Sequence, residues 1–462
     1  ITAYTGILYN ENKRQERKMI VDSARQAAHK ALVKMQRNGG YSNLVLDAQL
    51  ESAPLDRRDV ALACAIFYGV TERMYTLDFI IRKYVGSRTN KLPFSVINAL
   101  RMGTYQILYM DKIPAHAAVG ETVELVKKTD RWAVGFVNAV LKKILSERNQ
   151  CLDLIEQTDS PEIKYSCKRW IYDSLRKNYG GAADDILLKS FDSAQVSLRV
   201  NTLKNSRNEL ETLLKSSGVL SHVPFDKMDA LMLDSGSGIE QMRLYKEGRF
   251  HVQDIASQLC CMALSPQSGM RVLDVCSAPG GKSFTIAEMM EDNGEIISQD
   301  VHEARVKLIQ RGAERLGIRS IKSIKGDASE CSEDLGLFDR VLCDVPCSGL
   351  GVVSKKPDIK YKDYDEIKDL PQLQLKILMS AQKRLKPGGI LVYSTCTLRK
   401  DENESILNKF LQRCNLKPID ISGIYGIIDV NGKDSCTNMI TLFPHIHLTD
   451  GFFIAAFKRE DK

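Results

Sequence analysis

The stretch that decides the fold of this chain is Val272-Leu-Asp-Val-Cys-Ser-Ala-Pro-Gly-Gly-Lys-Ser283. An apolar run leads into a loop with two adjacent glycines, and a helical pattern begins at the second of them. Gly280 and Gly281 carry no side chain where a ligand can approach the backbone, and the first turn of a helix offers free N–H donors. The stretch therefore predicts a strand, a ligand-binding loop and a helix.

From about residue 251 onward, short apolar runs alternate with helical patterns. Such alternation is typical of βαβ units in a parallel, doubly wound sheet, which binds its ligands at the carboxyl ends of the strands. We therefore expect a Rossmann-like α/β domain over residues 251–462. The expected strands are 271–275, 295–299, 320–325, 339–343 and 389–394, and the expected helices are 281–290, 304–316 and 370–384.

The chain before this domain divides into two further parts. Helical periodicity with no competing strand pattern predicts an all-α domain over residues 1–148. Residues 146–160 are polar and aperiodic, so we expect a linker there. The segment 161–250 contains helical stretches at 164–179 and 208–216 and a strand-like run at 196–202, which together indicate a small α+β connecting domain.

The positive charge lies almost entirely in the first third. The whole chain of 462 residues has a net charge of +7, but residues 1–150 hold 23 Lys and Arg against 14 Asp and Glu, a balance of +9. The remainder holds 42 against 44, a balance of −2. This asymmetry favours a polyanion partner for the helical domain, although a solvated basic helix face would give the same count.

Composition excludes several other classes of protein. A hydrophobic fraction of 44% with 27% charged residues is ordinary for a globular chain and excludes a disordered one. No apolar run approaches the roughly 18 residues of a membrane-spanning helix, and the first ten residues do not resemble a secretory leader. The 12 cysteines include no Cys-x-x-Cys pair, so we expect neither a disulfide scaffold nor a metal site, and the cytoplasm as the compartment.

Three cofactors compete for the Gly280–Gly281 loop. A phosphate-binding Walker loop fails because Cys276 stands where its first glycine belongs, and the dinucleotide pattern of three spaced glycines is absent. S-adenosylmethionine is the remaining candidate for the cofactor that this loop binds. Asp300 ends the next strand, where a carboxylate can bind ribose hydroxyls, while Asp327 and Asp344 follow the third and fourth strands. Each acid alone is a common helix cap, but three at successive strand ends indicate a ligand site.

Two cysteines are expected at the same edge of the sheet. Val341-Leu-Cys-Asp-Val-Pro-Cys-Ser-Gly-Leu-Gly351 carries Asp344 and Cys347, and Cys396 follows the fifth strand in Tyr393-Ser-Thr-Cys-Thr397. A lone cysteine is most often a small buried apolar residue, and Cys343, inside its strand, is expected to be one. At one edge, however, Cys347 and Cys396 can both reach one substrate.

Methylation of a cytosine at C5 needs this set of groups. C5 is a poor nucleophile until a thiolate adds to C6, an acid near N3 neutralises the charge that develops, and a base later removes the C5 proton. Two thiols and a carboxylate supply these functions, whereas methylation of an exocyclic nitrogen or a hydroxyl needs no cysteine nucleophile.

With these residues the chain resembles the RsmB (Fmu/Sun) family of 16S ribosomal RNA cytosine-C5 methyltransferases, which carry an N-terminal NusB-like domain. The resemblance covers nearly the whole chain. The other stretches that carry it are Gly39-Gly-Tyr-Ser-Asn43, Leu100-Arg-Met-Gly-Thr-Tyr-Gln106, Ile113-Pro-Ala-His-Ala-Ala118, Gly135-Phe-Val-Asn-Ala-Val-Leu141, Ser197-Leu-Arg-Val-Asn-Thr202, Gly248-Arg-Phe-His-Val-Gln-Asp-Ile-Ala-Ser-Gln258, Lys356-Pro-Asp-Ile-Lys-Tyr361 and Thr449-Asp-Gly-Phe-Phe453.

The resemblance implies an enzyme that methylates ribosomal RNA of the small subunit, with residues 1–148 as the RNA-binding NusB-like domain. It makes Cys396 the nucleophile and Cys347 the residue that assists release. The family's loop more often has Ala where Ser277 stands. By the same resemblance, the S-adenosylmethionine site consists of Cys276, Ser277, Ala278, Pro279, Gly280, Gly281, Lys282, Asp300, Asp327 and Asp344.

Several assignments stay open on the sequence alone. Transfer RNA is an alternative substrate, and a non-catalytic RNA-binding assembly factor is an alternative function. Arg199 can contact RNA or form a salt bridge, and His251 is expected to be a structural hydrogen-bonding residue. Lys355, Lys356 and Lys360 follow the Cys347 motif, where they can contact phosphates or form a solvated loop.

Overall fold

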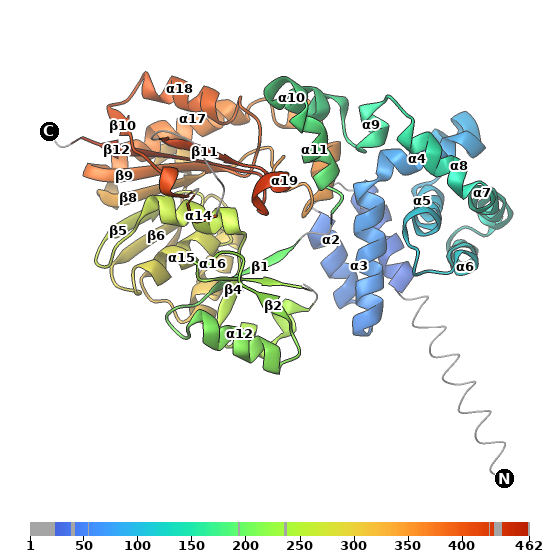
Figure 1. Ribbon diagram of the computed structural model, residues 1–462, viewed down its shortest axis with the longest axis horizontal. Helices are drawn as coiled ribbons and strands as arrows, with labels where there is room; N and C mark the ends of the chain where they lie inside the picture. Colours follow the sequence, from blue (N-terminus) through green and yellow to red (C-terminus); the bar gives the residue numbers. More distant parts are fainter. Residues whose placement is uncertain are drawn as a thin grey trace, which may run out of the picture. The chain divides into compact units, whose positions relative to one another are not determined.

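A computed structural model describes residues 24–37, 42–53, 55–192, 195–234, 238–424, 426–428 and 437–460 (Figure 1). Residues 1–23 and 38–41 of the expected helical domain lie outside these residues. The described chain divides into two compact units. The first runs to Ser174 and also includes Val353–Lys362, and the second comprises Leu175–Val352 and Asp363–Lys462. The expected domain limits at 148, 161 and 250 stay predictions.

The first unit is helical, as predicted, with a core of aliphatic side chains from several helices. The expected linker at 146–160 is wrong. Helix α8 (Arg148–Glu156) occupies most of this range, because Cys151 is fully buried in that core and Leu152 and Ile155 pack against it. The other helices are 24–37, α2 (Ser42–Glu51), α3 (Arg57–Glu72), α4 (Met74–Val85), α5 (Phe94–Tyr109), α6 (Ala115–Thr129), α7 (Val134–Ser146) and α9 (Pro161–Lys164).

A short segment from the second half of the chain belongs to the first unit. Val353–Lys362 contains the turn η6 (Pro357–Tyr361), in which the Tyr361 hydroxyl accepts a hydrogen bond from the backbone N–H of Met74 at 3.0 Å and lies 2.9 Å from Ser166 Oγ. Lys360 is fully buried. Lys360 is therefore neither a phosphate contact nor part of a solvated loop. Burial lowers its pKa to about 7, against the opposing charge of Glu72.

The second unit contains a small antiparallel sheet of strand order β2-β3-β1-β4. Its apolar face packs under helix α12 through Leu198, Leu210 and Leu214. The expected strand at 196–202 is the central strand β1. The elements are β1 (Val196–Val200), α12 (Arg207–Ser216), β2 (Ser221–His222), β3 (Ala230–Leu233), α13 (Arg243–Lys246) and β4 (Phe250–Val252), preceded by α10 (Arg169–Tyr179) and α11 (Ala182–Lys189).

The larger sheet confirms the Rossmann-like prediction. Its order is β10-β12-β9-β8-β5-β6-β7, and the pairs β5–β6, β6–β7, β5–β8 and β8–β9 are parallel. All five expected strands are present. They are β5 (Arg271–Asp274), β6 (Glu295–Asp300), β7 (Ile321–Lys325), β8 (Phe338–Asp344) and β9 (Leu385–Thr395).

Three further strands extend this sheet and were not predicted. β10 (Leu416–Pro418) and β11 (Met439–Leu442) both pair antiparallel with β12 (Phe452–Arg459), which pairs antiparallel with β9. The run Phe452-Phe-Ile-Ala-Ala-Phe457 is buried along its whole length. A continuous apolar run of six residues is the signal that identifies such a central strand.

Helices cover both faces of the larger sheet (Figure 1). Alternate strand residues point to opposite faces, so Val272 packs in the core with α14, α15 and α16, whereas Leu273 packs in the core with α17 and α18. These helices are α14 (Ile255–Leu264), α15 (Gly281–Met289), α16 (Glu303–Leu316), α17 (Leu370–Ala381) and α18 (Glu404–Leu411), and α19 (Pro444–His447) follows β11. In the part of the chain that the structure describes, no helix is long and apolar enough to cross a membrane.

Candidate active site

The strand order creates a switch point between β5 and β8. From β5 the chain proceeds to β6 and β7 on one side, and then returns to β8 and β9 on the other. Asp274 ends β5 and Asp344 ends β8, so both carboxylates lie at the crevice where doubly wound sheets bind ligands. Cys396 directly follows β9, the neighbour of β8.

A cavity of about 220 Å³ opens at this crevice. Seven of the residues that the sequence assigned to the cofactor line it. They are Cys276, Ser277, Ala278, Pro279, Gly281, Lys282 and Asp344.

Five lining residues were not assigned from the sequence. Asp274 lies in the quoted loop stretch, where it belongs to the expected strand 271–275. The other four come from the end of β4, the connection that follows it and the first turn of α14. This segment resembles the family, but its residue types indicated no specific role; they are Val252, Gln253, Asp254 and Ser257.

The loop at the cavity has a conformation that only glycine adopts readily. Gly280 has a φ of +110°, and a Cβ there would lie 2.4 Å from the ring of Phe284. It precedes α15, whose first turn carries N–H groups that have no acceptor within the helix. The local sequence thus exposes backbone donors at the cavity wall.

Asp274 lies beneath the loop and is fully buried. Its Oδ2 accepts a hydrogen bond of 2.7 Å from Ser283 Oγ, which in turn accepts one of 2.7 Å from Ser298 Oγ. Burial raises the pKa of Asp274 to about 7, although the bond from Ser283 opposes the shift. A carboxyl in this state can donate or accept a proton near neutral pH.

Asp300 and Asp327 end or follow their strands as expected, but they are not among the residues that line the 220 Å³ cavity. Asp300 is buried, forms an ion pair of 3.1 Å with Arg305 and accepts a hydrogen bond from the backbone N–H of His302. Asp327 accepts a 2.8 Å bond from the backbone N–H of Ser329. Hydrogen bonds from Ser329 also lower the pKa of Asp327.

The two cysteines singled out from the sequence lie together. Cys347 Sγ is 3.2 Å from Cys396 Sγ. The hydrogen bond to Cys396, together with burial, raises the pKa of the Cys347 thiol well above its ordinary value. One of the two sulfur atoms can therefore carry the proton while the other acts as a nucleophile.

Asp344 is held in place by two donors. Its Oδ2 accepts a bond of 2.6 Å from Lys282 Nζ, and its Oδ1 accepts one of 2.8 Å from Ser394 Oγ. Burial alone would lower the pKa of Lys282, but the charge of Asp344 and the bond to it raise that pKa above its ordinary value. Lys282 therefore stays protonated.

A buried carboxylate connects the loops that carry the two cysteines. Glu402 is fully buried, and its Oε2 accepts bonds of 2.9 Å from the backbone N–H of Ser348 and from Gln374 Nε2. Its Oε1 pairs with Arg399 at 3.1 Å. Glu402 thus fixes the residue next to Cys347 to the segment that follows Cys396. No sequence motif marks Glu402, so its role was not predicted.

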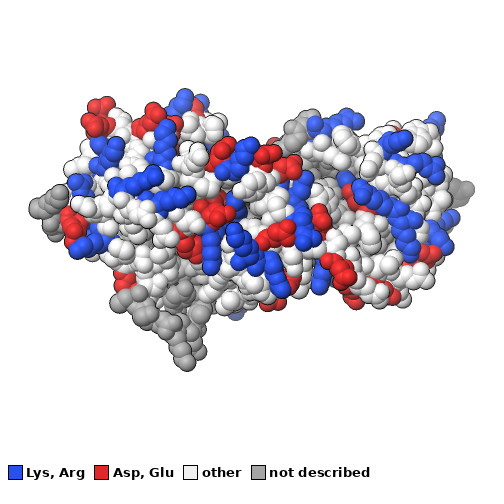
Figure 2. Space-filling view, turned by 90° about the horizontal axis from the view of Figure 1, so that it is seen from above, with Lys and Arg blue, Asp and Glu red and all other residues white. Residues whose placement is uncertain are grey.

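A second cavity, in the first unit, is basic. It measures about 420 Å³, and Lys30, Lys34 and Arg37 of the helix 24–37 line it together with Ser95 and Thr129. Lys and Arg side chains are also spread over the face drawn in Figure 2, with Asp and Glu side chains between them. The positive charges of Lys30, Lys34 and Arg37 suit the phosphate backbone of a nucleic acid.

Among the described residues, no group of three or more His, Cys, Asp or Glu side chains could hold a metal ion.

Comparison with protein families finds three matches along the chain. The 16S rRNA methyltransferase RsmB/F family matches residues 261–458, the NusB family matches residues 22–146, and the ferredoxin-like domain of RsmF/B-like methyltransferases matches residues 168–240. The three matches coincide with the large sheet, the helical unit and the region of the small sheet.

Curated relatives align over most of the chain. A probable ribosomal RNA small subunit methyltransferase B of Bacillus subtilis is 34% identical, over 95% of this chain and 99% of its own length. The ribosomal RNA small subunit methyltransferase B of Vibrio cholerae is 34% identical, over 85% and 89%.

Solved structures give the same result for the fold. The crystal structure of PH0851 superposes with a TM-score of 0.79 at 25% identity, over 95% of this chain and 99% of that one. A methyltransferase homologue from Pyrococcus horikoshii gives a TM-score of 0.56 at 28% identity, over 65% and 99%.

Proposed function

Because the chain belongs to the RsmB/F family of 16S rRNA methyltransferases, we propose that it transfers a methyl group from S-adenosylmethionine to C5 of a cytosine in small-subunit ribosomal RNA. The observation that carries this proposal is the pair of sulfur atoms 3.2 Å apart, Cys347 Sγ and Cys396 Sγ. Methylation of a nitrogen or a ribose hydroxyl has no use for two thiols at one substrate.

The cavity at β5 and β8 fits the proposed cofactor. Its wall combines the donors at the start of α15 with the carboxylates of Asp254, Asp274 and Asp344. Such a mixture suits a ligand that carries a carboxylate, an ammonium group and a sulfonium. We assign its binding to Cys276–Lys282 and Asp344. Asp300 and Asp327, which do not line this cavity, are assigned to it from their places at the strand ends and from the family resemblance. When bound, the cofactor supplies an electrophilic methyl group.

The chain's own residues prepare the cytosine. The Cys396 thiolate adds to C6, which makes C5 nucleophilic, and Asp344 acts as the acid that interacts with N3. Lys282 and Ser394 hold the Asp344 carboxyl in one orientation. After methyl transfer, a base removes the C5 proton and Cys396 leaves C6 as a thiolate, a release that Cys347 assists.

The RNA must present the base out of the helical stack. A stacked cytosine cannot reach a thiol at the end of a strand, so we expect an unpaired target or one that is flipped out at a cost of a few kcal/mol. The first unit, with its NusB-family match and its lining of Lys30, Lys34 and Arg37, binds the surrounding phosphates in this proposal.

Trapping of the covalent adduct tests the mechanism. The Cys347→Ala variant should accumulate a protein–RNA species that resists denaturant, because Cys396 can still add to C6 but release is blocked. Incubation with small-subunit RNA and denaturing electrophoresis would reveal it, and Cys347→Ala/Cys396→Ala is the matched control. Absence of this species, with labelled methyl still transferred by Cys347→Ala, would refute the role of Cys347 in release.

Bisulfite sequencing of RNA tests the substrate. Ribosomal and transfer RNA from a strain without this protein should differ from those of the parent by loss of a protected cytosine in the small-subunit RNA. A loss confined to transfer RNA would change the substrate but keep the chemistry. No loss in either RNA, and no methyl incorporation in vitro, would favour a non-catalytic binding factor.

A further inference from the structure

Gln253 lies in the cavity wall, in the short connection between β4 and α14. Its backbone is held firmly. Its N–H donates to the carbonyl of Ser197 at 3.1 Å, and its carbonyl accepts a bond of 2.8 Å from Ser197 Oγ and one of 3.2 Å from Gln258 Nε2. Only 6% of the residue is exposed. The side chain therefore has little freedom to move away from the cavity.

The two ends of the Gln253 amide differ. Oε1 accepts a bond of 2.6 Å from Thr285 Oγ1, whereas Nε2 has no hydrogen-bond partner among the residues that the structure describes. A buried donor that is left unpaired destabilises the protein, and one in the wall of a cavity can be satisfied by a bound ligand. Nε2 lies 3.8 Å from the position that a Cβ on Gly281 would occupy, beside the first residue of α15.

Several donors thus converge on one part of the cavity. The Gln253 amide and the free N–H groups at the start of α15 both favour an acceptor, and the positive end of the helix dipole favours a negatively charged one. The single anionic group of S-adenosylmethionine is the carboxylate of its methionine part. The acidic residues that line the cavity are then available to bind the ammonium and sulfonium groups of the same ligand.

We propose that Gln253 is a cofactor-binding residue, whose Nε2 donates a hydrogen bond to the methionine carboxylate of S-adenosylmethionine. This inference rests on the cofactor named in the proposed function. It adds a binding residue from the segment before α14, outside the glycine loop and the acids at the strand ends.

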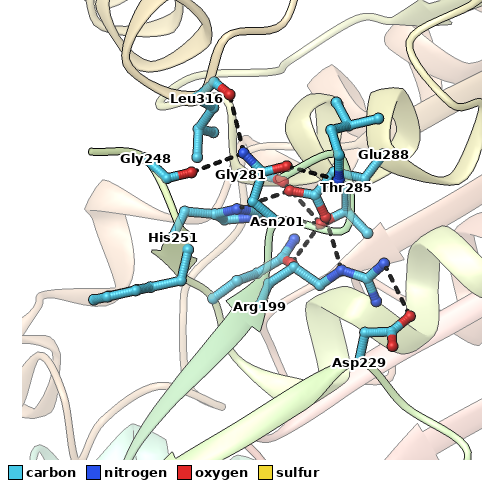
Figure 3. Close-up of polar contacts among 12 residues, drawn as sticks. Arg199, Asn201, Asp229, Gly248, His251, Gly281, Thr285, Glu288 and Leu316 are labelled. Atoms are coloured by element: carbon cyan, nitrogen blue, oxygen red, sulfur yellow. Dashed lines mark hydrogen bonds and ion pairs between the residues drawn. The ribbon is translucent and has the colours of Figure 1, made fainter. Parts of the chain in front are cut away.

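The surrounding network makes Thr285 a positioning residue (Figure 3). Thr285 Oγ1 lies 3.4 Å from His251 Nε2, and His251 Nδ1 lies 3.5 Å from Glu288 Oε1. The other carboxylate oxygen of Glu288, Oε2, forms an ion pair of 2.9 Å with Arg199 Nε, and both side chains are almost wholly buried. Arg199 therefore forms a salt bridge, one of the two alternatives left open by the sequence, and His251 is a structural residue as expected.

This network ties the cofactor site to the small sheet. Arg199 lies on β1 and His251 on β4, which pair with each other, whereas Thr285 and Glu288 lie on α15. The small sheet thereby orients the amide that faces the methionine carboxylate.

A ligand that lacks the carboxylate provides the test. Binding of S-adenosylhomocysteine and of 5′-methylthioadenosine, which has no amino-acid part, would be measured by calorimetry on the full chain, without RNA. Gln253→Leu should weaken S-adenosylhomocysteine by at least about tenfold, the effect of losing one bond to a charged group, and should leave methylthioadenosine unchanged. Thr285→Val should show the same selectivity with a smaller loss, and the exposed Gln372→Leu on α17 should change neither.

The outcomes separate this inference from the proposed function. Unchanged binding of S-adenosylhomocysteine to Gln253→Leu would overturn the inference alone. An equal loss for both ligands would also overturn it, because Gln253 would then support the cavity as a whole. If the unaltered protein bound neither ligand, the proposed cofactor itself would be wrong, and the inference with it.

Discussion

Cys347 Sγ and Cys396 Sγ lie 3.2 Å apart although 49 residues separate them in the chain. They follow β8 and β9, which are neighbouring parallel strands, and so both reach the same edge of the sheet. The backbone N–H of Gly351 donates to the carbonyl of Cys396 at 2.9 Å, which joins the two loops directly. Strand order thus produces the pair of thiols on which the proposed chemistry depends.

Replacement of the proposed nucleophile should separate chemistry from binding. We expect Cys396→Ala to abolish methyl transfer while S-adenosylhomocysteine still binds, because Cys396 is not among the residues that line the cofactor cavity. Labelled-methyl incorporation and calorimetry measure the two effects. The buried Cys343→Ala is the matched control and should retain transfer. Full activity of Cys396→Ala would contradict the mechanism.

The stability of the protein should fall when one member of the Lys282–Asp344 ion pair is neutralised and the other is left charged. Asp344→Asn leaves the ammonium of Lys282, which is only 12% exposed, without its counter-charge. We expect a loss of about 3 kcal/mol in the free energy of unfolding and loss of methyl transfer. The double variant Lys282→Met/Asp344→Leu should be more stable than Asp344→Asn, although inactive. Chemical denaturation followed by a probe in the second unit measures this, and a double variant less stable than the single one would contradict the expectation.

Asp274 should make the free energy of unfolding fall as pH rises, which is opposite to the usual effect of a carboxyl group. Its pKa is about 7 in the folded chain and about 3.8 when exposed, so the folded state binds more protons between these values. Stability should therefore fall as pH rises from 4 to 7, by an amount on the order of 4 kcal/mol from this group. Hydrogen exchange of the β5 amides measures the effect. Asp274→Asn should be more stable relative to the unaltered protein at pH 8 than at pH 5, and parallel profiles would refute the shift.

Gly351 should tolerate no side chain. A Cβ at this position would lie 1.8 Å from the carbonyl oxygen of Gly451, which is rigid backbone. We expect Gly351→Ala to displace the Cys347 loop, to reduce methyl transfer at least tenfold and to cost about 2 kcal/mol of stability. Gly120→Ala is the control, since nothing lies within 4 Å of a Cβ there. Normal activity of Gly351→Ala would show that the loop can shift without consequence.

Local sequence patterns were sufficient to predict the parallel strands of the larger sheet and seven of the residues that line its cavity. The five expected strands and the loop at Gly280 are present because apolar periodicity and glycine conformation act within a few residues. The antiparallel strands β10–β12 and the helix α8 were missed. Their stability comes from partners distant in the chain, such as β9 for β12 and the aliphatic core for Cys151.

Sequence alone was enough to identify the methyltransferase family and to propose its chemistry, because a glycine loop, acids at strand ends and two cysteines are each recognisable as residue types in a pattern. It did not establish which polar groups are buried and paired. Lys360 was expected either to contact phosphates or to lie in a solvated loop, and it is instead buried in the first unit. Gln253 carried no signal, and it faces the cavity with an amide donor that is unpaired within the described chain. Burial and pairing depend on contacts between segments far apart in the chain, and only the tertiary structure brings those segments together.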